Sequence, residues 1–205
     1  MEVNVIWDGL REGVKQITLL EATAVFFGLL SVWYSRLENI LVFPTGIISV
    51  LIYVYICFGA KLYADVGINA YYFIMSIYGW YLWSRKDVNN HFLPITTNSS
   101  KEWVISIATL IGSFIIIAYV LINFTDSDVP YWDALTTSMA FVAMLLMAKK
   151  KLENWIAWIF TNLLSIPLYF YKGLMLTSFQ FLIFLILAIL GFTRWRREIS
   201  IQKNL

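Results

Sequence analysis

The sequence predicts an all-α integral membrane protein. Hydrophobic residues make up 60% of the 205 residues and charged residues only 14%, and the mean hydropathy is +0.72. A chain of this composition has too little polar side-chain surface to cover a soluble globule. The apolar residues also form continuous runs instead of alternating with polar ones, which argues against transmembrane strands and favours helices.

Seven runs are long enough to cross a membrane. A helix rises about 1.5 Å per residue, so about twenty apolar residues span a hydrocarbon core of roughly 30 Å. The predicted spans are 17–35, 39–59, 65–84, 103–123, 132–148, 154–171 and 174–193.

The segments outside these spans differ in composition. In residues 1–16, Asp8, Arg11, Glu12 and Lys15 interrupt apolar residues at helical spacing, which is typical of an amphipathic helix lying in the interface. Residues 85–102 contain Pro94 and a polar run, and we interpret them as a cytoplasmic linker. The predicted domains are the helix 1–16, a triple-helix bundle 17–84, the linker 85–102, a connecting transmembrane helix 103–123, a second bundle 132–195 and a cytoplasmic tail 196–205.

This 3+1+3 arrangement depends on an internal repeat. Arg36-Leu37-Glu38-Asn39 opens one apolar stretch and Lys151-Leu152-Glu153-Asn154 opens another. Each half then ends in an aromatic, basic segment, Tyr78–Arg85 in the first and Leu190–Arg196 in the second. Parallel repeats in a membrane protein predict a pseudo-two-fold axis along the bilayer normal and a small-molecule site near midplane. Within the two stretches we align Thr45 with Thr161, Ser49 with Ser165, Tyr53 with Tyr169 and Tyr55 with Tyr171.

One proline lies in the second helix of each half, Pro44 and Pro167. Proline removes a backbone hydrogen bond inside a helix, so both positions predict kinks that could act as hinges. A tolerated irregularity in a packed bundle is the alternative.

Basic residues set the predicted orientation. Most of them lie in the segments between the spans that share a side of the membrane with the carboxyl terminus. The positive-inside rule therefore places the carboxyl terminus in the cytoplasm and the amino terminus on the external side. The predicted cytoplasmic residues are Arg36, Arg85, Lys86, Lys101, Lys149, Lys150, Lys151, Arg194, Arg196, Arg197 and Lys203, against Arg11, Lys15, Lys61 and Lys172 outside.

Polar and aromatic side chains at helical spacing mark the candidate substrate site. One stripe in the third span contains Asn69, Tyr72, Ser76, Trp80 and Trp83, and one in the sixth contains Trp155, Trp158, Asn162, Ser165 and Tyr169. The ten predicted substrate-binding residues are those of the two stripes other than Trp83 and Tyr169, together with Ser49 and Gln180. Flat rings with a few amide and hydroxyl groups suit a planar, neutral or cationic heteroaromatic molecule. Two alternatives stay open, an interfacial aromatic belt for the tryptophans and interhelical hydrogen bonding for the deeper amides.

Other activities find little support in the sequence. No ionisable side chain lies in the middle of a predicted span, so a proton relay is missing and a facilitator without ion coupling is favoured. No catalytic, metal-binding or cofactor-binding motif is present, and Cys57 is the only cysteine. The small net charge of +2 does not indicate nucleic acid as a partner. We therefore expect a protein that is not an enzyme.

Several motifs resemble the PnuC family of bacterial vitamin transporters from about Leu20 to Trp195. They are Leu20-Glu21-Ala22, Tyr78-Gly79-Trp80-Tyr81-Leu82-Trp83, Trp132-Asp133, Met144-Leu145-Leu146-Met147 and Glu153-Asn154-Trp155-Ile156-Ala157-Trp158. The resemblance implies a SWEET-like fold, a homotrimer in the lipid of the bacterial inner membrane, and facilitated diffusion of an unphosphorylated vitamin. A cytosolic vitamin kinase would then trap the product.

The substrate expected from the resemblance is nicotinamide riboside or thiamine. Members that take nicotinamide riboside have asparagine in place of Ser49, glutamine in place of Asn69 and asparagine in place of Leu190, whereas Asn162 matches. Three changed polar contacts are enough to alter ligand choice, and riboflavin is a further family substrate. A vitamin-binding subunit of an ATP-driven transporter is the alternative function.

Overall fold

The structure is a computed structural model that describes residues 17–86, 88 and 90–202, together with residues 8, 10–12, 14 and 15. The predicted interfacial helix over 1–16 lies largely outside the described residues, although those of its residues that are described are helical.

Seven long helices account for most of the described chain, and each contains one predicted span or most of it. This confirms the all-helical fold class. The helices are α2 (Leu19–Arg36), α3 (Val42–Gly59), α4 (Tyr63–Ser84), α5 (Ser100–Phe124), α6 (Pro130–Ala148), α7 (Glu153–Tyr171) and α8 (Met175–Gln202).

Local sequence explains where several helices begin. Thr18 and Glu21 form a capping box at the start of α2, and Ser99 and Glu102 form another at the start of α5. Each box satisfies backbone N–H groups that have no partner within the helix. Pro130 stands at the start of α6, where its missing N–H removes no helical hydrogen bond.

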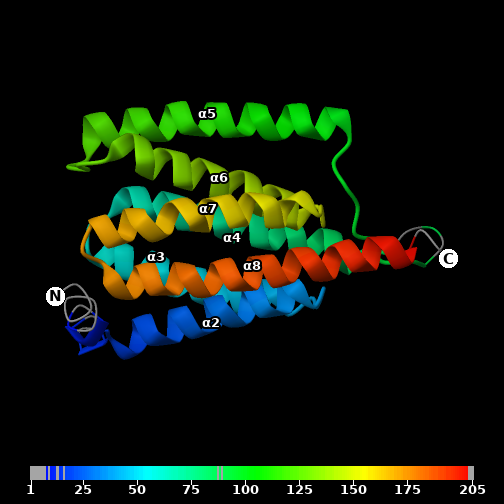
Figure 1. Ribbon diagram of the computed structural model, residues 1–205, viewed down its shortest axis with the longest axis horizontal. Coiled ribbons are helices and arrows are strands. Elements are labelled where there is room, and N and C mark those ends of the chain that lie inside the picture. Colours follow the sequence, from blue (N-terminus) through cyan, green and yellow to red (C-terminus); the bar gives the residue numbers. More distant parts are fainter. Residues whose placement is uncertain are drawn as a thin grey trace.

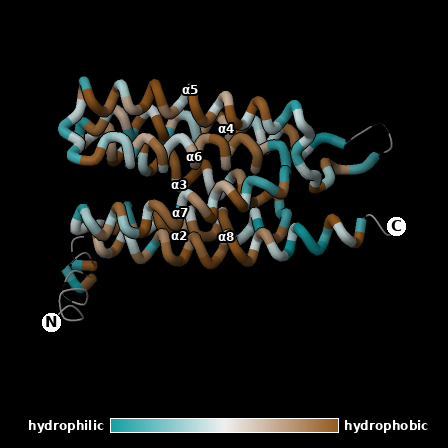
Figure 2. Tube along the Cα trace, turned by 45° about the horizontal axis from the view of Figure 1, so that its top comes forward, coloured by the Kyte–Doolittle hydropathy of each residue, from teal (hydrophilic) through white to brown (hydrophobic). Residues whose placement is uncertain are grey.

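Four of the described helices, α3, α5, α6 and α8, are long and apolar enough to cross a membrane by length and composition. Figure 2 shows hydrophobic residues along the middle of the bundle, while hydrophilic residues gather near its ends and on the last turns of α8.

Six helices form a closed ring through their pairwise contacts, and α5 lies outside it, at the top of Figure 1. In the first half, α3 packs between α2 and α4, and in the second half α7 packs between α6 and α8. The halves meet at two seams, α4 against α6 and α2 against α8. The extensive packing of α5 is against α6. The ring therefore consists of two like-ordered triplets joined through α5.

The backbone reveals the register of the repeat. The second residue after the end of α2 and of α6 has a left-handed backbone conformation. These residues are Glu38, with φ 57°, and Lys150, with φ 56°. Lys61 after α3 and Gly173 after α7 form a second such pair, with φ 60° and 73°. The separation in sequence from Glu38 to Lys150 equals that from Lys61 to Gly173, and we call it the repeat offset. Left-handed residues at this place terminate helices by a common motif.

The repeat offset corrects the alignment expected from the sequence. Pairing Ser49 with Ser165 implies a separation that is longer than the repeat offset by about one helical turn. At the repeat offset, the counterpart of Ser49 is Thr161 and that of Tyr53 is Ser165. Similar residues one turn apart misled the comparison, because they occupy the same helix face.

The predicted kink at Pro44 is also wrong. Pro44 is the third residue of α3, where an intrahelical donor is not required. Pro167, in contrast, lies inside α7. Side chains donate to carbonyl groups close to it: Ser178 Oγ to Ile166 O at 2.9 Å and Trp132 Nε1 to Leu164 O at 3.1 Å.

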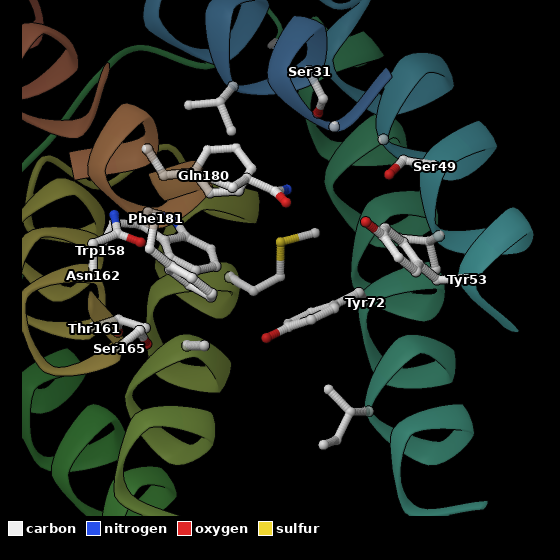
Figure 3. A pocket seen from close by; sticks show the side chains of 18 of the residues that line it. Ser31, Ser49, Tyr53, Tyr72, Trp158, Thr161, Asn162, Ser165, Gln180 and Phe181 are labelled. Atoms are coloured by element: carbon white, nitrogen blue, oxygen red, sulfur yellow. The ribbon is translucent and has the colours of Figure 1, made fainter. Parts of the chain in front are cut away.

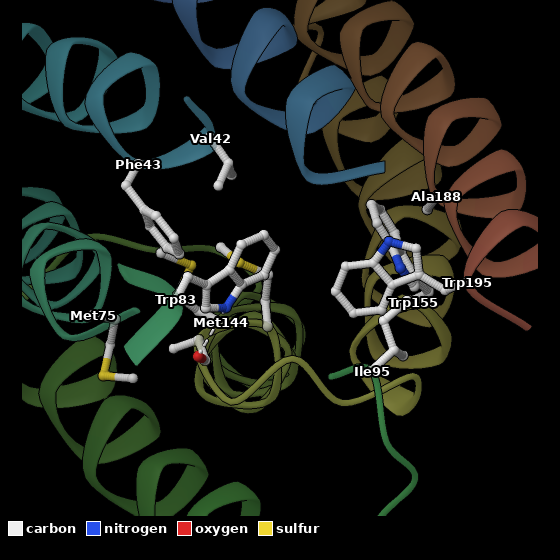
Figure 4. Close-up of a cluster of buried hydrophobic side chains, with 11 residues drawn as sticks. Val42, Phe43, Met75, Trp83, Ile95, Met144, Trp155, Ala188 and Trp195 are labelled. Atoms are coloured by element: carbon white, nitrogen blue, oxygen red, sulfur yellow. Dashed lines mark hydrogen bonds between the residues drawn. The ribbon is translucent and has the colours of Figure 1, made fainter. Parts of the chain in front are cut away.

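An aromatic cluster closes the ring at the end where α8 finishes (Figure 4). In the first half, Phe43 packs edge-on against Trp83, with ring centroids 5.1 Å apart at 87°. In the second half, their counterparts at the repeat offset, Trp155 and Trp195, pack against each other at 5.5 Å and 88°. All four rings are buried, so the cluster, which we call the aromatic plug, forms the core at this end.

The described residues of the segment 85–99 lie at the same end, and residues 95–98 are anchored to the corner between α6 and α7. Ile95 is buried, Leu152 N donates to Thr96 O at 2.9 Å, and Asn98 N donates to Glu153 Oε1 at 3.0 Å. Lys151 Nζ pairs with Glu102 Oε1 at 2.8 Å. The connection between the halves is thus ordered against the second half.

Candidate substrate site

A cavity of about 460 Å³ lies inside the six-helix ring. This is the size of a typical pocket for a small organic molecule. Every helix of the ring contributes to its lining, whereas α5 contributes none. The cavity therefore lies between the two halves, the position that parallel repeats predict.

The wall formed by α7 and α8 carries the side chains best suited to hold a planar ligand (Figure 3). Trp158, Asn162 and Ser165 project from α7, and Gln180 and Phe181 from α8. Asn162 and Ser165 are buried, and within the described part of the chain neither side chain has a hydrogen-bond partner in the protein. Such groups in a bilayer are costly unless water or a ligand satisfies them. They are free to orient a ligand that stacks on Trp158.

The opposite wall comes from α2, α3 and α4 (Figure 3). The Tyr72 ring projects into the cavity, and Ser76 lies one turn further along α4. Ser49 Oγ donates to Ala24 O at 2.8 Å, and Asn69 Nδ2 donates to Asp65 O at 2.8 Å. These two side chains already have a backbone partner, so they shape this wall and keep acceptor oxygens for a ligand.

The cavity ends at the aromatic plug, of which Trp155 is the member that lines it. Trp155 is 1% exposed, and its ring fills the space above Gly191, where a Cβ would lie 2.6 Å from ring carbons. Its Nε1 is buried without a partner, as is Ser35 Oγ, which also belongs to a lining residue. This end of the cavity thus combines close packing with two buried polar groups that have no partner in the described part of the chain.

Exposure rises toward the opposite end, where α4 begins. Asp65 lines the cavity there and is exposed, while Tyr53, Tyr169 and Thr177 are partly exposed. Beside this mouth, Lys172 Nζ pairs with both carboxylate oxygens of Asp133 at 2.7 Å. The cavity is therefore closed at the plug and accessible at the Asp65 end.

Nine of the ten predicted site residues line this cavity, and the structure does not bring Trp80 to it. Trp80 is 41% exposed on the outside of α4. Each step of four residues turns a helix face by about 40°. Two such steps, from Tyr72 to Ser76 and on to Trp80, carry the indole off the cavity face.

Sequence reasoning missed several lining residues. Thr161 and Phe181 are the counterparts of Ser49 and Asn69 at the repeat offset, so the repeat in its correct register would have found them. Gly28 and Gly46 lack any side chain that would signal a site, yet a Cβ on Gly46 would lie 3.0 Å from Ser31 Oγ. The lining residues that are not among the ten predicted include Gly28, Ser31, Gly46, Tyr53, Asp65, Thr161, Phe181 and Phe184, and also Tyr169, which belongs to the predicted stripe.

Comparison with known proteins identifies the family. Residues 18–197 match the family described as nicotinamide mononucleotide transporter. The chain belongs to this family. It is thus a membrane transporter and not an enzyme, and the resemblance to PnuC proteins seen in its motifs is confirmed.

Individual relatives share only a modest part of the sequence. The nicotinamide riboside transporter PnuC of Escherichia coli (strain K12) is 26% identical over 208 residues, covering 89% of this chain and 87% of the relative. The riboflavin/roseoflavin transporter RibM of Streptomyces davaonensis is 23% identical over 175 residues, covering 82% and 80%. The crystal structure of the vitamin B3 transporter PnuC matches with a TM-score of 0.71 at 21% identity, covering 97% of this chain and 89% of that one.

Proposed function

We propose that this transporter is a facilitator (uniporter) for an unphosphorylated heteroaromatic vitamin, nicotinamide riboside or thiamine. The observation that carries the proposal is the cavity between the halves, in which the Trp158 ring lies beside the unpartnered amide of Asn162. An aromatic ring can stack on the indole while the amide bonds one polar substituent. The names of the PnuC relatives favour nicotinamide riboside, and that of RibM shows that related chains also take a larger ring system.

We further propose that all seven long helices cross the bacterial inner membrane in a 3+1+3, SWEET-like arrangement, with the amino terminus outside and the carboxyl terminus in the cytoplasm. Helices α2, α4 and α7 have 18, 22 and 19 residues, which is sufficient to span. Part of their polar surface faces the cavity, as with Ser31 of α2, Asn69 of α4 and Asn162 of α7. In this orientation the mouth at Asp65 faces outward and the aromatic plug faces the cytoplasm.

Uptake by a facilitator needs a sink. We propose that a cytosolic vitamin kinase phosphorylates the product and so keeps its free concentration low. Assembly as a homotrimer and this link to a kinase rest on the family resemblance and are expectations for the chain.

Transport by the purified chain in liposomes tests the function. Labelled nicotinamide riboside or thiamine should equilibrate across the membrane without ATP and without an ion gradient. Strict dependence on a proton or sodium gradient would overturn the facilitator mechanism. Binding without any transport would favour the second candidate, a vitamin-binding subunit of an ATP-driven transporter, although such a subunit does not require two triplets around one cavity.

A further inference from the structure

One residue that lines the cavity carries a formal charge. Asp65, on the first turn of α4, is the only charged residue among the described residues that line the cavity. The remaining lining side chains are apolar, hydroxyl or amide groups. A single carboxylate at the mouth of an otherwise uncharged chamber sets the sign of the local electrostatic field.

The carboxylate is not a consequence of the repeat. The counterpart of Asp65 in the second half, at the repeat offset, is Thr177, which also lines the cavity but is uncharged. The fold therefore does not require an acid at this place. At the matching position in the other half, a neutral hydroxyl lines the opposite wall of the cavity.

The neighbouring charged residues do not cancel the negative charge of Asp65. Asp133 is neutralised by its ion pair with Lys172 at 2.7 Å. Within the described part of the chain, no basic side chain pairs directly with Asp65, although Asp133 and Lys172 both lie within electrostatic range of it. The charges of that pair largely cancel at a distance, so Asp65 adds an unpaired negative charge at the mouth.

Aromatic rings line the cavity between the mouth at Asp65 and the deeper site, and their faces can attract a cation. Tyr169 lies within electrostatic range of Asp65, and its ring stacks on Phe181 with centroids 5.0 Å apart at 13°. Tyr72 stands two turns further along α4, with its ring in the cavity. Aromatic faces are negative and attract cations, whereas amides and hydroxyls bond either charge state.

We propose that Asp65 selects positively charged heteroaromatic substrates over neutral ones of the same shape. This inference rests on the proposed function, because it concerns the substrate of the same cavity. Thiamine and nicotinamide riboside both carry a cationic ring, whereas riboflavin is neutral. A carboxylate that is partly open to water is screened, so we expect an effect of about fivefold in affinity, which shrinks as salt is raised.

Nicotinamide riboside and its 1,4-dihydro form provide the test, since the two nucleosides have nearly the same shape and only the first is charged. Their dissociation constants should be measured on purified wild-type protein and on Asp65→Asn. Wild type should prefer the cation. In Asp65→Asn, affinity for the cation should fall about fivefold, while affinity for the neutral form should stay the same or rise.

Asp128→Asn is the matched control, because Asp128 is an exposed acid before α6 that lies outside the cavity lining. It should retain the wild-type preference. An unchanged preference in Asp65→Asn, or an equal loss in Asp128→Asn, would overturn the inference alone. Failure of wild type to bind either nucleoside or thiamine would overturn the proposed function together with it.

Discussion

Trp83 and Trp195 occupy matching places in the two halves, and each donates a hydrogen bond across a seam to the other half. Trp83 Nε1 bonds Ala148 O at the end of α6, and Trp195 Nε1 bonds Ser35 O near the end of α2, both at 3.2 Å. Their rings lie 6.1 Å apart. The third helix of each half therefore holds the first helix of the opposite half, which closes the ring beneath the cavity.

Close packing at the plug predicts that Gly191→Ala is destabilising. A Cβ at this position would lie 2.6 Å from three ring carbons of Trp155, which is fully buried and cannot easily move. We expect a loss of about 1–3 kcal/mol, as is typical of overpacking. Thermal unfolding in detergent measures it. Gly112→Ala on α5, where a Cβ meets nothing within 4 Å, is the control. Equal unfolding temperatures for the two variants would contradict the packing described.

The left-handed residues after α3 and α7 should respond to substitution with opposite changes in stability. Gly173 has φ 73° with open space around it, so Gly173→Ala should cost about 1 kcal/mol through backbone strain alone. Lys61→Gly at the matching position should be neutral or slightly stabilising. Thermal unfolding of both variants checks the opposite signs. Destabilisation of similar size in both would show that the positions are not equivalent.

Trp158→Ala should weaken substrate binding about tenfold, because it removes the stacking surface of the α7 wall. Trp80→Ala removes the same side chain from the outside of α4 and should leave the dissociation constant unchanged. Titration of each variant with nicotinamide riboside and thiamine gives both constants. Equal losses would mean that the tryptophan effect is not local to the cavity.

Asn162→Ala should also weaken binding about tenfold, since the amide has no partner among the described residues and a ligand would supply one. Asn123→Ala, at the end of α5 and outside the cavity, is the control. Thermal shifts with and without vitamin separate binding from stability. If ligand stabilisation of Asn162→Ala equalled that of wild type, the residue would not belong to the site.

The positions of the helices could be predicted from the sequence because each apolar run has the length that a bilayer requires. The stripe from Trp155 to Ser165 lies along the cavity as its spacing indicated, since that spacing keeps to one helix face. The register of the repeat could not be predicted, because Thr161 and Ser165 lie one turn apart and both resemble residues of α3. Trp80 was misplaced for a similar reason, a drift of the face over two turns. Packing partners such as Phe43 above Gly79 leave no periodic signal.

The central claim is that one chamber between two like-oriented halves holds one vitamin. Isothermal titration of the purified chain with nicotinamide riboside and with thiamine tests it most directly. We predict saturable binding of at least one of them at one molecule per chain, with affinity lost in the double variant Trp158→Ala, Asn162→Ala. No saturable binding of either vitamin, or undiminished affinity in the double variant, would contradict the account.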